Sequence, residues 1–109
     1  MLDHPEKTAR LLAALMAAVP FEVELTPELI DYLRAEKIAI AGGPRHVVSG
    51  VSYAGDEGGI MCRIVRTDKG EALVVSLTHV HVPRSMPLAR AVADYQKHRV
   101  KKLRKQDSR

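Results

Sequence analysis

The fold is decided by residues 45–82, which read RHVVSGVSYAGDEGGIMCRIVRTDKGEALVVSLTHVHV. Three runs rich in apolar residues, at about 45–54, 60–67 and 71–82, are separated by two turn signals, Gly55-Asp56-Glu57-Gly58-Gly59 and Asp68-Lys69-Gly70. Runs of this length between glycine-containing turns are typical of β-strands. We therefore predict an antiparallel three-stranded meander.

The pattern leaves the register of the second hairpin open. A two-residue loop would place Arg66 opposite Glu71 and would pair Ile60, Cys62 and Ile64 with Leu77, Val75 and Leu73. A three-residue loop with Gly70 as a bulge would shift every pair by one position. In the first strand we expect Val47, Val51 and Tyr53 to share one side.

The third run is apolar at four consecutive positions, 72–75, which predicts a strand that is covered on both faces and is therefore central. Its second face would meet either a helix or a second subunit. The sequence does not distinguish these two arrangements, and the second would make the protein a homodimer.

The flanking segments predict three helices. Residues 6–18 carry apolar residues at helical spacing, and Pro20 ends that helix. Residues 21–25 alternate between apolar and acidic, which indicates a short strand at an edge of the sheet. Thr26 and Pro27 begin a second helix that runs to about residue 37, and residues 38–43 could add a further strand. Ser85-Met86-Pro87 begins a long final helix with Ser85 as its cap.

Size and composition indicate one domain with a single core. The chain has 109 residues, 46% of them hydrophobic, and no apolar stretch of the ~20 residues that span a bilayer. The first residues lack the basic region of a signal peptide. Cys62 is the one cysteine, so no intramolecular disulfide can form and we expect a cytoplasmic protein. The fold class that we predict is α+β, with two N-terminal helices and one long C-terminal helix packing the meander.

Positive charge is concentrated in the last quarter of the chain. Residues 84–109 hold nine Lys or Arg against two Asp, a net charge of +7, whereas residues 1–83 hold eight basic and eleven acidic residues, a net charge of −3. We expect residues 1–96 to form the domain and residues 97–109 to be a basic helix end that projects or frays. The residues that we predict to bind a polyanion are Lys97, Arg99, Lys101, Lys102, Arg104 and Lys105.

The small number of aromatic residues limits the ways in which the protein could contact a nucleic acid. Of the aromatics only Tyr53 lies on the three main strands, so base stacking on the sheet is disfavoured, whereas contact with a duplex backbone remains open. The order helix, three strands, helix over 27–105 and the stretch Gly43-Pro44-Arg45-His46 resemble double-stranded-RNA-binding domains. That family begins its last helix with a Lys-Lys-x-Ala-Lys cluster, whereas this chain has Ser85-Met86-Pro87-Leu88-Ala89 there. We therefore assign the chain to no family.

The histidines and the cysteine are the other candidates for a chemical role. His79 and His81 are two apart on a predicted strand, which would place both on one face as a pair of metal ligands. A third ligand could come from Cys62, His46, Asp56 or Glu57. Cys62 has apolar neighbours in the sequence and is interpreted as a buried core thiol.

These observations favour a small non-enzymatic binding module without a cofactor. Its basic helix would contact nucleic acid or an acidic protein, and we expect no membrane contact because the tail lacks bulky apolar anchors. The alternatives are a metal- or small-molecule-binding protein, with or without enzymatic activity, that uses the face bearing His79 and His81, and a homodimeric structural protein.

Overall fold

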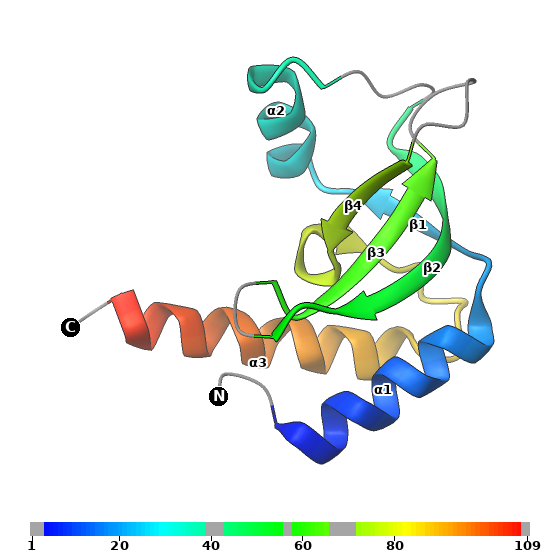
Figure 1. The fold of residues 1–109 in the computed structure, drawn as a ribbon, viewed down its shortest axis with the longest axis vertical. Coiled ribbons are helices and arrows are strands. Elements are labelled where there is room, and N and C mark those ends of the chain that lie inside the picture. The colour runs from blue at the N-terminus through cyan, green and yellow to red at the C-terminus, as the bar shows by residue number, and fades with distance from the viewer. Residues whose placement is uncertain (1–3, 39–42, 56–57, 66–71, 108–109) are drawn as a thin grey trace.

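The protein is an α+β domain in which three helices pack around a curled five-stranded antiparallel sheet (Figure 1). The computed structural model describes residues 4–38, 43–55, 58–65 and 72–107. The strand order is β4-β3-β2-β1-β5. The elements are α1 (Pro5–Ala18), β1 (Phe21–Leu25), α2 (Pro27–Ala35), β2 (Arg45–Tyr53), β3 (Ile60–Val65), β4 (Ala72–Ser76), the 3-10 helix η2 (Leu77–His79), β5 (Val80–His81) and α3 (Ala89–Asp107).

The sheet is larger than the predicted meander because two short strands join it. The alternating segment β1 pairs with β2 on one side and with β5 on the other, so it lies inside the sheet and not at an edge. The predicted third strand, 71–82, is divided. Its first part is β4, the turn η2 redirects the chain, and β5 then crosses to the opposite edge of the sheet.

This division corrects the prediction that the third strand is central. β4 is an edge strand, and Val74 on it is 53% exposed. Val75 is buried in the core and Leu73 is partly buried against it. The apolar run therefore reflects one covered face plus one exposed valine.

The second hairpin has the register of the two-residue loop. Cys62 pairs with Val75 and Ile64 pairs with Leu73, as that alternative predicts. The loop itself lies outside the described residues, as does most of the stretch 38–43 in which a further strand was considered. In β2, the pairing with β3 shifts between Val48 and Gly50. Val48 is buried and Val51 packs against the core, while Val47, predicted to share a side with Val51, is half exposed.

The helices begin at identifiable caps. Thr26 caps α2, because its hydroxyl accepts a hydrogen bond from the Leu29 amide at 3.2 Å, as predicted. His4 caps α1 through its imidazole. The final helix starts at Ala89 and not near Ser85. Proline disfavours a helical conformation in the residue before it, so Met86 cannot lie within a helix that continues through Pro87.

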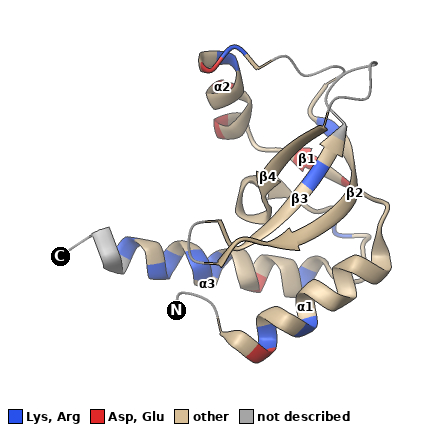
Figure 2. Ribbon diagram, in the orientation of Figure 1, with Lys and Arg blue, Asp and Glu red and all other residues tan. Residues whose placement is uncertain are grey.

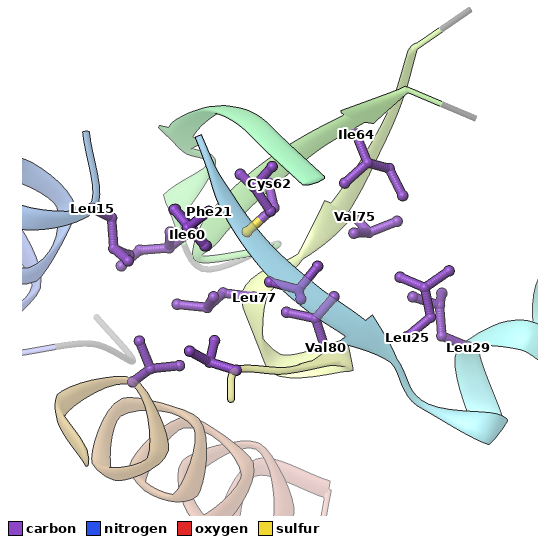
Figure 3. Packing of buried hydrophobic residues seen from close by; sticks show 14 of the residues in the cluster. Leu15, Phe21, Leu25, Leu29, Ile60, Cys62, Ile64, Val75, Leu77 and Val80 are labelled. Atoms are coloured by element: carbon purple, nitrogen blue, oxygen red, sulfur yellow. The ribbon is translucent and has the colours of Figure 1, made fainter. Parts of the chain in front are cut away.

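The core lies between the inner face of the sheet and the helices (Figure 3). Leu15 of α1, Ile60 of β3 and Leu77 of η2 are completely buried in it. Leu29 of α2 lies near Leu25 in the core (Figure 3), and Leu33 of the same helix is also buried in it. In Figure 1, α1 and α3 lie together at one end of the sheet and α2 lies at the other end. The two N-terminal helices therefore do not pack side by side.

Candidate anion-binding surface of helix α3

Side chains of α3 form hydrogen bonds with the backbone of the sheet and of η2. The amide nitrogen Nε2 of Gln96 donates hydrogen bonds to the carbonyls of Leu77 and Val80, each at 2.7 Å. The hydroxyl of Tyr95 accepts a hydrogen bond from the Ile60 amide at 3.0 Å. These contacts fix the rotation of α3 about its axis, so they determine which of its residues face outward.

Arg99 lies on the side of α3 that packs against the rest of the protein. It is only 2% exposed, and its guanidinium lies beside Gly59, where an added β-carbon would come within 3.0 Å of it. The packed part of α3 therefore continues through Arg99, two residues past Lys97, where the sequence predicts the projecting end to begin. A buried guanidinium is not accessible to an external phosphate, so the candidate surface rests on the other basic residues.

The outward side of α3 carries a row of cations. Lys97, Lys101 and Arg104 are exposed and follow the spacing i, i+4, i+7, which places them on one face of a helix. Arg90, seven residues before Lys97, is exposed and shares this face. We call these four residues the α3 basic face. Lys102 is exposed on the flank, and nothing is described of the Lys105 side chain.

The cations of the α3 basic face are not neutralised by the protein's own carboxylates. None of the four forms an ion pair with an Asp or Glu among the described residues. Sequence reasoning missed Arg90 as a member of this face, although the interval of seven between Arg90 and Lys97 was a usable signal.

Charge is segregated along the molecule (Figure 2). The basic residues of α3 cluster toward its C-terminal half, where the helix extends past the sheet. Acidic residues are most numerous on β1 and α2 (Glu22, Glu24, Glu28, Asp31 and Glu36), but α1 carries the exposed Glu6 and α3 carries the exposed Asp94. A phosphate polymer approaching the C-terminal half of α3 would therefore meet Lys97, Lys101 and Arg104, with the Asp94 carboxylate on the turn before them.

The two histidines proposed as metal ligands are not presented as a pair by one strand. His79 ends η2, whereas His81 lies on β5 opposite Glu24. The backbone carbonyl of His79 accepts hydrogen bonds from both the amide and the hydroxyl of Thr26. The prediction that His79 and His81 share a face requires both residues to lie on one strand. The 3-10 turn at residues 77–79 removes that condition.

The suggested third ligands do not complete a metal site in the described part of the chain. Cys62 is fully buried, and burial raises the pKa of its thiol to about 12. His46 bonds through Nε2 to the Gly43 carbonyl at 2.9 Å. Asp56 and Glu57 lie outside the described residues. Among the residues that are described, no group of three His, Cys, Asp or Glu side chains could hold a metal ion.

Comparisons with known proteins give no family assignment. No family model matches the chain, and no curated protein or solved structure matches it. Within the described residues, every helix is too short or too polar to cross a membrane.

Proposed function

We propose that this protein is a small non-enzymatic binding module that contacts the phosphate backbone of a nucleic acid through the α3 basic face. The supporting observation is that Lys97, Lys101 and Arg104 are exposed on one side of a helix whose other side is fastened to the core. None of them is paired with a carboxylate among the described residues. Cations held in this way bind phosphates without first losing an internal partner.

The length of the α3 basic face is compatible with contact along a duplex. At about 1.5 Å per residue, Arg90 and Arg104 are about 21 Å apart along the helix. This length corresponds to about six base pairs of duplex at about 3.4 Å each. Base stacking is a weaker candidate, because Tyr53 is the one aromatic on β2, β3 and β4 and it is only 39% exposed.

The experiment is a binding titration of the full chain with a 20-base-pair duplex RNA or DNA at several salt concentrations. Four phosphate contacts give a slope of log affinity against log salt of about −3.6 on B-DNA. The triple substitution Lys97→Gln, Lys101→Gln and Arg104→Gln should reduce this slope by about 2.7. Point substitutions are preferable to truncation after Gln96, because truncation would also remove the buried Arg99.

A matched control removes three cations elsewhere. Arg34, Lys37 and Arg63 are exposed and lie outside α3, so their replacement by Gln changes the net charge equally. The control should keep the slope of the unmodified protein. An equal loss in both triple variants would mean that only net charge matters, and a slope near zero in the unmodified protein would remove the proposal. Binding of poly-glutamate in preference to the duplex would favour an acidic protein as the partner.

A further inference from the structure

A groove of about 720 Å³ separates helices α1 and α3, on a different side of α3 from the α3 basic face. In Figure 1 the two helices run in opposite directions, with the start of α1 beside the middle of α3. Leu11 and Ala14 of α1 and Leu88 and Ala91 of α3 line one part of the groove. The short side chains of Ala14 and Ala91 leave space between the helices there. The volume is in the range of small-molecule sites, about 300–1,000 Å³.

The other part of the groove is polar and rich in hydrogen-bond donors. It is lined by His4, Lys7 and Thr8 from the first turn of α1 and by His98 from α3. The Nδ1 atom of His4 accepts a hydrogen bond from the Lys7 amide at 3.3 Å. The ring proton of a neutral His4 is therefore on Nε2, which remains a donor.

Thr8 is the residue that points most directly to a ligand. It is 6% exposed and lines the groove, yet its hydroxyl has no hydrogen-bond partner among the described residues. A buried hydroxyl without a partner is unfavourable, so a bound group that pairs with it would recover this cost. The N-terminal end of α1 also favours negative charge.

The charges of the groove define the ligand class. Lys7 and Arg10 are cationic, and among the residues that the structure describes Asp94 is the one carboxylate that lines the groove. We propose that the α1–α3 groove binds a small anionic amphiphile, with its carboxylate among Lys7, Thr8 and His4 and its apolar body between Ala14 and Ala91. This site is separate from the α3 basic face and goes beyond the proposed nucleic-acid contact.

The test is calorimetric titration of the full chain with decanoate, below its micelle concentration, and with decanol as the uncharged probe. Decanoate should bind, and decanol should bind about ten-fold more weakly because it lacks the charge-assisted hydrogen bonds. Lys7→Gln should weaken decanoate binding by about ten-fold, whereas Arg34→Gln on α2 should leave it unchanged. Asp94→Asn should strengthen it, because this substitution removes the carboxylate that repels the ligand.

A second pair of variants tests the apolar part of the groove. Ala91→Leu fills the space between the helices and should abolish decanoate binding. Ala93→Leu makes the same chemical change at an exposed position that does not line the groove and should leave binding intact. Neither variant should change the salt slope for duplex binding, so the two proposals can fail independently. Absence of decanoate binding, equal affinity for decanol, or equal effects of the two leucine substitutions would overturn the inference.

Discussion

The hydroxyl of Tyr95 accepts a 3.0 Å hydrogen bond from the backbone amide of Ile60, so the middle of α3 is tied to the first residue of β3. Gly59, the preceding residue, has a φ of 67°. A β-carbon added there would collide with the Tyr95 hydroxyl and would crowd the Arg99 guanidinium. Glycine at this position therefore allows α3 to approach the end of the β2–β3 hairpin.

Substitution of Gly59 should be far more damaging than substitution of Gly55. Both have a positive φ, 67° and 66°, but a β-carbon at Gly55 would meet nothing within 4 Å. Gly55→Ala should cost about 1 kcal/mol for the backbone conformation alone. Gly59→Ala should cost about 2–4 kcal/mol, because the collision adds to the backbone cost. Urea denaturation of both variants measures the difference. Equal losses would show that the contact with Tyr95 does not constrain the helix.

Local patterns in the sequence predicted most of the individual elements. The apolar spacing of 6–18 and the alternation of 21–25 correspond to α1 and β1 within one residue, and the cap at Thr26 is confirmed. These features depend on neighbouring residues, so the sequence contains the relevant information. The α+β class followed from them.

The arrangement of the strands could not be predicted in the same way. The pairings of β1 with β2 and with β5 join residues that are far apart in the chain. The apolar run before Leu77 continues into η2 without a proline or glycine, and the one local mark of the break is Ser76, whose hydroxyl accepts a hydrogen bond from the Thr78 amide. For the candidate surface, the sequence identified the exposed lysines of α3. The burial of Arg99 was not predictable, because it depends on the position of Gly59 in space.

Gln96 should be a main determinant of how α3 is attached. Its side-chain nitrogen donates to two carbonyls, those of Leu77 and Val80. Gln96→Ala leaves both acceptors without this donor and should cost about 1–3 kcal/mol. Gln96→Glu should cost more near neutral pH, because a carboxylate would face two carbonyl oxygens.

The Gln96→Glu variant also has a pH dependence of defined sign. The two carbonyls favour the protonated carboxyl group, so its pKa in the folded state would be raised above the unfolded value. Its stability should therefore be highest below the unfolded pKa and should fall as the pH rises through the folded pKa. Thermal unfolding of the Glu and Ala variants from pH 4 to pH 8 measures this. Parallel curves would exclude the contact.

Adjacent basic residues of α3 should differ in role. Arg99→Met should cost about 2–3 kcal/mol of folding stability, because the guanidinium is buried and has interaction partners within the protein. Lys97→Met should change stability by less than about 0.5 kcal/mol, because Lys97 is exposed. It should instead reduce the salt slope of duplex binding by about 0.9. Denaturation and salt titration of both variants separate the two roles, and a Lys97 variant with an unchanged slope would contradict the nucleic-acid proposal.

The Cys62 thiol should be inert in the folded protein and should make stability decline at alkaline pH. Burial raises its pKa from 9.0 to about 12, so the thiolate that reacts with iodoacetamide is scarce until the chain unfolds. Above about pH 9 the unfolded chain loses this proton while the folded chain keeps it. The contribution of the thiol to stability is therefore complete below pH 9 and is lost by about 1.4 kcal/mol per pH unit as the pH rises toward 12.

The matched variant for this prediction is Cys62→Ala, which lacks the titrating group. The cost of Cys62→Ala should be constant below pH 8 and should shrink between pH 9 and pH 10.5, because only the unmodified protein is destabilised by thiol ionisation in the unfolded state. Urea denaturation of both proteins across this range measures the difference. A cost independent of pH, or alkylation of the native protein as fast as the unfolded one, would mean that Cys62 is accessible to water.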